Sequence, residues 1–389
     1  MKKKVLIVFK YPRGNWNPAI INKFSIFYDT KHLYVSNYKN KNFDETIEDI
    51  NNIVKSENIE IVVFDVDYFK LINFFFIEKI KSNKKILITG DDFELHDMNA
   101  ITASACDLVL SHCPLSVLKY REKGFESYII DFEKGKIGEK NNVKKDIDVL
   151  FFGALSSDRA NILNYLKNEG IKIENVGHVE GESGLPEEEL LKLITRSKIV
   201  LNLSKSRSNS VKKYNSENIY KYYYQFKGRI IMAGLNGAVC VSEYSPGQEL
   251  LFNEKEVPTF FTKEECAKIL KNLLSNNQSL LECTSKFTSK VCDIHEDKKS
   301  FKIISNAIEK SENRKVELLK IPYWYLRIAA KQAILRNIKL SNIFKTIFQF
   351  GIIFRMVNKS NFFAKILIFA ETFLNILWYS IMHTLKPKK

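Results

Sequence analysis

The strongest constraint on the fold is an alternation of short apolar runs with longer segments that carry apolar residues at helical spacing. The runs 5–9, 85–89 and 108–111 are typical of strands that are buried on both faces. Such strands, separated by amphipathic helices, predict a parallel sheet covered on both sides. The alternation breaks at 132–146, a polar and charged stretch with two glycines, and then starts again. We therefore expect two doubly wound α/β domains joined by a linker.

The expected boundaries place a Rossmann-like domain at 1–135, a linker at 136–147, a second such domain at 148–312 and a helical extension at 313–389. Ligands of such sheets bind at the carboxyl ends of the strands, so we expect the site in the cleft between the two domains. The expected strands are residues 5–9, 60–64, 85–89, 108–111, 128–131, 148–152, 171–176, 198–203 and 238–242. The expected helices are residues 45–56, 69–82, 114–123, 158–169, 186–196, 227–235 and 263–275, the last with a capping box of Thr262 and Glu265.

The positive charge is concentrated near the carboxyl terminus. Residues 314–389 hold 14 Lys or Arg and 2 Glu, while the whole chain has a net charge of +15. A nucleic-acid-binding protein would place a basic face on the folded domain, so this pattern argues against nucleic acid. It favours an anionic membrane surface as the partner of residues 316–389. The segment 361–382 carries a polar stripe, which indicates a helix lying on a membrane; packing on the protein and crossing the bilayer are the alternatives.

The cysteines and the first residues favour a cytoplasmic protein. Six cysteines show neither a CxxC pair nor zinc-ligand spacing, so we expect reduced thiols and no metal site. The apolar run after the amino-terminal lysines has five residues, which is too short for a signal peptide.

A first candidate binding segment follows the strand at 148–152. Gly153 ends that strand, and a helix begins near Ser157 or Asp158. A glycine lets a ligand approach the backbone, a helix start suits a phosphate, and Arg159 adds a charge with bidentate geometry. The alternative is that Ser156–Asp158 only caps the helix.

A second candidate segment runs from Lys227 to Glu249. Arg229 opens an apolar helix that Gly237 ends, and a buried strand leads to a loop. The loop contains Glu243, Gly247 and Glu249. Cations suit a diphosphate and carboxylates accept hydrogen bonds from sugar hydroxyls, although surface ion pairs would explain the same residues.

A third candidate segment follows the strand at 85–89 and holds Asp91, Asp92 and His96. Such groups can deprotonate an acceptor hydroxyl, which makes these three the candidate catalytic residues. The alternative is that one aspartate caps the next helix. His112, after the next strand, is a weaker candidate.

The stretch 148–273 resembles the donor domain of glycosyltransferase group 1 proteins, which have the GT-B fold, and is most similar to the spore-maturation branch. The resemblance is carried by 148–153 with Arg159, by 198–203, by Arg229 with Gly237, by 243–249 and by a helix that begins at 263. It implies a nucleotide-sugar donor on the second domain, an acceptor mainly on the first, and neither a metal nor a cofactor. The donor-binding residues would be Gly153, Arg159, Asn202, Lys205, Arg229, Gly237, Glu243, Gly247 and Glu249.

The chain departs from this family at two positions. Retaining members carry two glutamates where Tyr224 and Met232 stand here, and neither of these side chains accepts hydrogen bonds as a carboxylate does. Glu243 or Glu249 takes over that work, or the donor differs, or activity is lost. The resemblance leaves the retaining or inverting course open.

The leading hypothesis is a glycosyltransferase at the inner face of the plasma membrane that moves a sugar from a nucleotide donor to a cell-surface glycan or a lipid-linked acceptor. Arg159, Lys205 and Arg229 would neutralise the leaving diphosphate. Two alternatives stay open: a non-catalytic glycan-binding or scaffold protein with a degenerate site, and transfer of another group such as a phospho-polyol.

Overall fold

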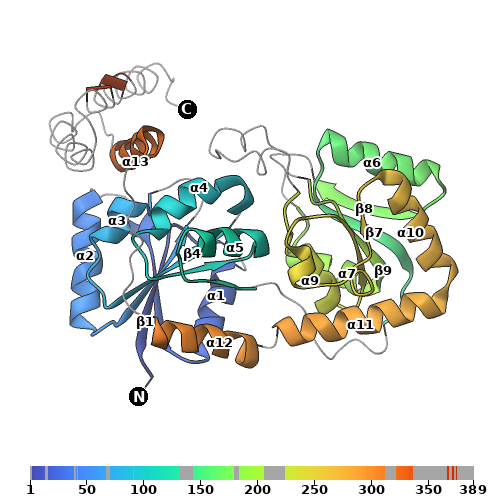
Figure 1. Cartoon of the computed structure of the whole chain (residues 1–389), viewed down its shortest axis with the longest axis horizontal. Coiled ribbons are helices and arrows are strands. Elements are labelled where there is room, and N and C mark those ends of the chain that lie inside the picture. The colour runs from blue at the N-terminus through green and yellow to red at the C-terminus, as the bar shows by residue number, and fades with distance from the viewer. Residues whose placement is uncertain are drawn as a thin grey trace. The chain divides into compact units, whose positions relative to one another are not determined.

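The chain folds into two compact units, each built around its own parallel sheet (Figure 1). Unit 1 comprises Met1–Ser111, Lys119–Tyr128 and Ile308–Lys389, and unit 2 comprises His112–Leu118 and Ile129–Ala307. The computed structural model describes residues 2–13, 16–38, 41, 43–66, 71–90, 92–131, 143–178, 184–205, 224–295, 297–311, 321–335, 366, 367, 370, 371 and 374. Most of the expected linker and most of the basic extension lie outside these residues.

The sheet of unit 1 has the strand order β2-β1-β3-β4-β5-β6. The pairs from β2 to β5 are parallel, as the apolar runs predict. The sequence patterns missed β2 because this edge strand alternates between partly buried and exposed residues and contains no apolar run. The strands are β1 (Lys4–Phe9), β2 (Asp29–Tyr34), β3 (Ile61–Val66), β4 (Lys84–Thr89), β5 (Leu108–Ser111) and β6 (Ser127–Ile129).

Helices lie on both faces of this sheet (Figure 1). In α2, Phe43, Ile47, Ile50 and Val54 recur at helical spacing and are all buried. The helix expected at 69–82 is much shorter, because α3 begins only after Asn73, whose side chain caps it. The helices are α1 (Trp16–Ser25), α2 (Phe43–Ser56), α3 (Phe74–Glu78), α4 (Asp92–Ala103) and α5 (Pro114–Glu122), with a 3-10 turn η1 (Val35–Tyr38).

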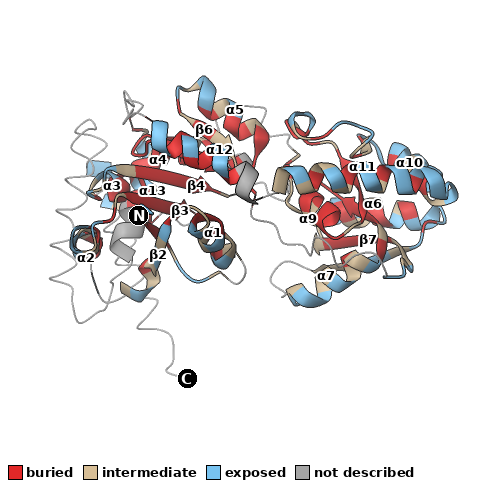
Figure 2. Cartoon of the chain, turned by 90° about the horizontal axis from the view of Figure 1, so that it is seen from below, coloured by how far each residue is buried: buried red, intermediate tan, exposed pale blue. Residues whose placement is uncertain are grey.

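The sheet of unit 2 has the order β11-β10-β9-β7-β8, and all neighbouring strands in it are parallel. Burial is greatest along the strands and the inner sides of the helices (Figure 2). The strands are β7 (Ile147–Ala154), β8 (Ile173–His178), β9 (Ser197–Asn202), β10 (Val239–Glu243) and β11 (Thr259–Phe260). The helices are α6 (Ser157–Asn168), α7 (Glu187–Arg196), α9 (Arg229–Leu235), α10 (Lys263–Ser275) and α11 (Asn277–His295), with a 3-10 turn η3 (Gln248–Leu250).

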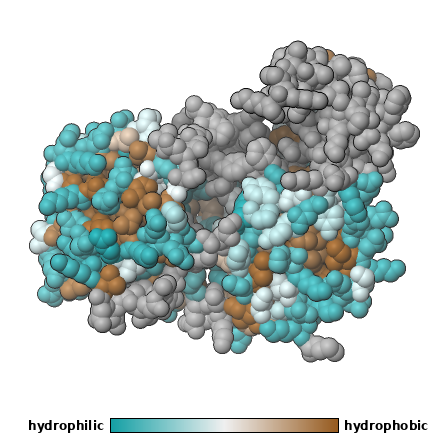
Figure 3. Space-filling view, turned by 180° about the vertical axis from the view of Figure 1, so that it is seen from behind, coloured by the Kyte–Doolittle hydropathy of each residue, from teal (hydrophilic) through white to brown (hydrophobic). Residues whose placement is uncertain are grey.

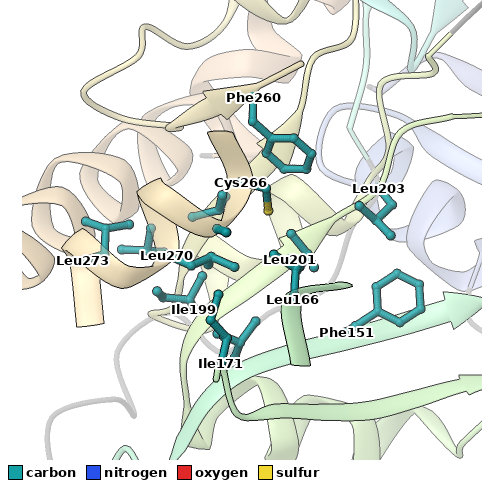
Figure 4. Packing of buried hydrophobic residues seen from close by; sticks show 14 of the residues in the cluster. Phe151, Leu166, Ile171, Ile199, Leu201, Leu203, Phe260, Cys266, Leu270 and Leu273 are labelled. Carbon is teal, nitrogen blue, oxygen red and sulfur yellow. The ribbon is translucent and has the colours of Figure 1, made fainter. Parts of the chain in front are cut away.

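Two hydrophobic clusters cover the two faces of the second sheet. One packs α6 and α10 on β7 and β9 through residues such as Phe151, Leu166, Leu201 and Leu270 (Figure 4). The other packs α9 and α11 on the opposite face. The expected capping box at the start of α10 is confirmed, because Thr262 and Glu265 bond each other's backbone N–H groups.

The chain returns to unit 1 near the end of α12 (Asp297–Lys310). Helix α13 (Tyr323–Leu335) belongs to unit 1, and its Tyr325 is buried at 1% exposure. The Tyr325 hydroxyl accepts the Phe74 N–H at 2.8 Å and lies 2.9 Å from the Thr102 hydroxyl. The first part of the expected extension at 313–389 is therefore a packed element of unit 1.

Hydrophobic patches lie among hydrophilic residues on the face shown in Figure 3. Within the described part of the chain, no helix is long and apolar enough to cross a membrane. None of the six cysteines forms a disulfide.

Both sheets repeat one topology. In each, the second strand of the unit lies on one side of the first strand and the third lies on the other. The direction in which successive strands are added to the sheet thus reverses between β1 and β3 in unit 1, and between β7 and β9 in unit 2. Ligands of doubly wound sheets bind at the carboxyl ends of the strands at such a switch point.

Candidate functional site

Gly153 and Arg229 meet at the carboxyl end of β7. Gly153 has φ +101°, and a Cβ atom added there would lie 2.5 Å from Nη2 of Arg229. The partly buried guanidinium also lies 5.6 Å from the ring of Phe151 and 5.4 Å from that of Phe152. A glycine at this position therefore leaves the room in which the arginine lies beside the backbone. The structure thus brings together two residues that the sequence predicted separately.

Arg159 fills the switch point between β7 and β9. It is 3% exposed and donates to the carbonyls of Ala154 at 2.6 Å, Leu203 at 3.0 Å and Lys205 at 3.0 Å. Its guanidinium thereby joins the ends of both strands. The alternative interpretation of this segment also holds, because Ser156 caps α6 by accepting the Arg159 N–H at 3.4 Å. This geometry favours a supporting role for Arg159, with its charge close below the strand ends.

Glu243 and Lys205 lie together beyond the carboxyl ends of β9 and β10. Glu243 is 6% exposed and accepts the Lys205 backbone N–H at 2.9 Å. Burial raises the pKa of Glu243 above its usual value. The exposed ammonium of Lys205 pairs with Asp158 at 2.8 Å, beside the start of α6. A cation and a carboxylate thus stand on the edge that also holds Arg229.

Asn202 anchors a chain of buried polar side chains at the same edge. It donates to Ser204 at 2.9 Å and to Ser242 at 2.8 Å. Ser242 donates in turn to Gln248 at 3.1 Å, and Gln248 to Thr259 at 2.9 Å. These bonds fix the loops after β9 and β10, so the position of Asn202 favours shaping of the site over contact with a ligand.

The loop after β10 contains Gly247 and Glu249. Gly247 has φ +87° and begins η3, and Glu249 is exposed on that turn. Glu249 interacts with Tyr244, whose ring is stacked on Phe261 at 4.9 Å. This exposed aromatic pair lies outside the predicted residues. A simple signal for it is that both aromatics directly follow strands.

Gly237 lies at the other end of the sheet. It has φ +71° just after α9 and precedes β10, and its carbonyl accepts from Lys145 at 2.9 Å. Lys145 precedes β7, and in a parallel sheet the residues that precede the strands share the amino edge. Gly237 therefore ends a helix as expected, but the structure does not bring it to Gly153 and Arg229.

Tyr224 and Met232, the two positions that depart from the family pattern, lie in different surroundings. Tyr224 pairs with Lys205 in an isolated antiparallel bridge, so its backbone lies at the carboxyl edge. Met232 packs against the hydrophobic cluster under α9. A thioether at that position supplies apolar contact in place of a carboxylate.

Asp92 is buried in unit 1 at 1% exposure. It accepts from Asn99 at 2.6 Å and Tyr120 at 2.8 Å, and also from the hydroxyls of Thr89 and Ser111. Burial raises its pKa, and these four donors oppose that rise. Four donors occupy both carboxylate oxygens, so this arrangement favours a carboxylate that fixes the ends of β4 and β5.

His96 is also fully buried, and its ring lies 4.6 Å from that of Tyr120. Burial lowers its pKa to about 3, with Lys123 and Lys119 adding to the effect, so the ring is neutral near pH 7. A catalytic base must reach the acceptor, and neither His96 nor Asp92 reaches solvent here. Asp91, the third candidate, lies outside the described residues.

Polar and aromatic side chains gather instead at the switch point of unit 1. Trp16 Nε1 donates to Asp65 at 3.2 Å, and Lys10, Tyr11 and Arg13 follow β1 directly. The sequence patterns missed this group, although Asp65 interrupts an apolar strand near its end. Among the described residues, no group of His, Cys, Asp and Glu has the arrangement of a metal site.

The chain has two parallel-sheet Rossmann-like units, and the comparisons with known structures identify its fold as GT-B. Residues 142–293 match the model of a family described as glycosyl transferase-like. This match covers most of unit 2, including Gly153, Arg229 and Glu243. No curated protein sequence matches the chain.

Solved structures resemble most of the chain at low sequence identity. HepE of Anabaena, solved with UDP and glucose, has a TM-score of 0.56 at 11% identity and covers 79% of this chain and 99% of its own. The same protein with UDP-glucose has a TM-score of 0.53 at 10% identity, with coverage of 78% and 99%. A putative UDP-N-acetylglucosamine 2-epimerase of Listeria monocytogenes has a TM-score of 0.50 at 11% identity, with coverage of 82% and 100%. These similarities establish the fold.

Proposed function

We propose that this protein is a glycosyltransferase that takes a sugar from a nucleotide-sugar donor bound at the carboxyl edge of unit 2. The observation that carries the proposal is the contact between Gly153 and Arg229 at the end of β7, inside the matched family region. A guanidinium beside partly exposed backbone suits the diphosphate of such a donor, and its charge would stabilise the leaving group. The similar HepE structures contain UDP and UDP-glucose, so a UDP-sugar is the first donor to test.

The other edge residues support this donor site. Lys205 would add a second cation, and Glu249 would accept from donor hydroxyls in place of the absent glutamate at Met232. Glu243 and Asn202 would hold the loops in position. On this proposal the site uses no metal and no cofactor beyond the nucleotide sugar, because the cations of the chain neutralise the diphosphate.

Arg229→Ala tests the donor site. We expect it to abolish turnover and the thermal stabilisation of the protein by UDP, while its far-UV circular dichroism stays native. Arg196→Ala is the matched control, since Arg196 is an exposed arginine of the same unit that pairs with Asp146 at the amino edge. Full activity of the Arg229 variant would contradict the assignment of Arg229 to the donor site. Stabilisation by GDP or CMP in place of UDP would keep the enzyme and change the donor.

We further propose that the acceptor is a surface glycan or a lipid-linked glycan, met at the cytoplasmic face of the plasma membrane. The basic composition of residues 316–389 supports this, because anionic lipids attract such segments. A deletion that tests it should begin after Leu335, since α13 is part of unit 1. In a flotation assay with anionic vesicles, we expect the shortened protein to float with the vesicles less than the full chain does. Undiminished flotation would refute membrane binding by the removed segment.

The second candidate function is a non-catalytic glycan-binding or scaffold protein. The observation that favours it is Met232, whose partly buried side chain packs against the hydrophobic cluster at the position where the resembled family carries a glutamate. Absence of stabilisation by every nucleotide and nucleotide sugar, together with binding to a glycan array, would select this function over the enzyme.

A further inference from the structure

Five residues gather at the switch point of unit 1, where the sheet topology places a ligand. Lys10, Tyr11 and Arg13 follow β1, Trp16 begins α1, and Asp65 stands near the end of β3. β1 and β3 are the adjacent strands at which the strand order of the sheet reverses. Ligand crevices of doubly wound sheets open at this point. The group lies in unit 1, separate from the residues proposed to hold the donor.

Two of these side chains bring positive charge to one aromatic ring. The Lys10 ammonium and the Arg13 guanidinium each lie 5.3 Å from the ring centroid of Tyr11. Tyr11 is 39% exposed, and both cations are only partly buried. Asn17 holds the loop by donating to the Tyr11 carbonyl at 3.0 Å. Two cationic side chains on one loop beside an aromatic ring are a setting that suits a bound anion.

The floor of the site is an oriented indole. Asp65 is 4% exposed and accepts the Trp16 N–H at 3.2 Å, which fixes the ring at the end of β3. Gly90, just after β4, lies against the same ring, because a Cβ atom built there would be 4.0 Å from Cζ2 of Trp16. The partly exposed indole thus lies at the ends of β3 and β4. An aromatic face of this kind can cover the apolar C–H face of a sugar ring while the hydroxyls of the sugar stay at its rim.

We propose that this site binds the acceptor, and that the acceptor is a sugar bearing a phosphate group. Trp16 and Tyr11 contact the sugar ring, Lys10 and Arg13 bind the phosphate, and Asp65 holds Trp16 in place. The Arg13 guanidinium can bind two phosphate oxygens at once, whereas the Lys10 ammonium acts as a point charge. The identity of this ligand as an acceptor rests on the proposed function; the phosphate preference of the site does not.

The test compares glucose 6-phosphate with glucose as probes by isothermal titration of the full chain. We expect the phosphorylated sugar to bind at least about tenfold more tightly, as charge-assisted hydrogen bonds do. The double variant Lys10→Gln with Arg13→Gln should lose this preference. The matched control is Lys55→Gln with Lys81→Gln, which removes the same charge beside a hollow of about 570 Å³ at the amino edge of the same sheet and should keep the preference.

Two further measurements test the proposal independently of the double variant. Arg13→Glu should reverse the preference for the phosphorylated sugar even if the double variant folds poorly, and thermal melting reports folding of each variant. A dodecyl ester of the same sugar phosphate separates two sources of this chemistry. Tighter binding than the free compound indicates a lipid-linked acceptor, and equal binding indicates a soluble or polymeric glycan phosphate.

Failure of this inference is distinct from failure of the proposed function. Equal binding of glucose and glucose 6-phosphate, or a preference that survives in the Lys10 and Arg13 variants, overturns the site whether or not UDP stabilises the protein. If the preference depends on these residues but no nucleotide sugar binds, the anion site stands and the glycosyltransferase assignment fails.

Discussion

The two sheets of this chain share one strand order, yet their carboxyl edges are built differently. At the switch point of unit 2, Arg159 binds three backbone carbonyls and Arg229 lies beside Gly153. At the switch point of unit 1, an indole fixed by a carboxylate stands next to a loop with two cations. Topology thus sets where each site lies, and the residues after the strands set what it can bind.

The comparison also separates residues that look alike in the sequence. Arg159 and Arg229 both follow apolar strands of unit 2, but only Arg159 is fully buried and bound to the backbone. Asp92 and Asp65 both stand at strand ends of unit 1, but only Asp65 lies at the switch point. Burial thus separates the two arginines and position in the sheet separates the two aspartates, and the predictions below test the roles assigned to residues of this kind.

The largest effect is expected for Arg159. Arg159→Met removes a buried cation and leaves three carbonyls without their donor, which should lower the free energy of unfolding by about 3–5 kcal/mol. Arg196→Met breaks only an exposed ion pair with Asp146 and should cost less than about 1 kcal/mol. Urea denaturation of both variants measures the difference. Equal costs would show that Arg159 does not hold the strand ends together.

Asp92 should come next. Asp92→Asn replaces a carboxylate that accepts from four donors, and the new amide must point one N–H at a donor, so we expect a loss of about 2–3 kcal/mol. Asp44→Asn, at a partly exposed pair with Lys79, is the control and should cost less than about 1 kcal/mol. A catalytic Asp92 would instead show native stability with a large loss of turnover.

His96 should make unit 1 sensitive to acid. Its folded pKa of about 3 lies below the usual value of 6.5, so between these pH values the unfolded chain binds a proton that the folded chain does not. The free energy of unfolding should therefore fall as pH drops below 6.5, by roughly 2 kcal/mol at pH 5. His96→Phe should remove this part of the pH dependence. An unchanged slope between pH 6.5 and 5 would mean that His96 is accessible to protons.

The smallest effect on stability is expected at two glycines with positive φ. Gly153→Ala and Gly170→Ala should each cost about 1 kcal/mol in backbone strain. A Cβ atom at Gly153 would displace the Arg229 guanidinium, whereas nothing lies within 4 Å of one at Gly170. Only Gly153→Ala should therefore weaken UDP binding, measured by isothermal titration. Equal UDP affinity in both variants would argue against Arg229 as the diphosphate ligand.

The sequence predicted the fold better than the site, for a physical reason. Buried parallel strands are continuous apolar runs, so β1, β4, β7 and β10 could be found directly, whereas the half-exposed β2 carried no such signal. Residues at strand ends could be found in the same way. Which of them face solvent depends on packing between distant segments, and no local pattern reveals that.

Arg159 and Gly237 illustrate this limit. The spacing placed Arg159 correctly at the start of α6, but its burial depends on the carbonyl of Leu203, 44 residues away. Gly237 was placed correctly at a helix end, but its separation from Gly153 follows from the parallel order of β7 and β10. The family resemblance assigned both residues to one site because it compares residues in the order of the chain. It does not say at which edge of the sheet each residue lies.

The buried hydroxyl of Tyr325 has a consequence for biosynthesis. Its partners, Phe74 and Thr102, are synthesised more than 200 residues earlier, and all of unit 2 emerges from the ribosome in between. The unit that starts to fold first is therefore the last to be completed, and Phe74 and Thr102 lack their Tyr325 partner while unit 2 is made. Such a nascent chain gives chaperones a long interval in which to bind, and a stop codon just before α13 would remove that partner permanently.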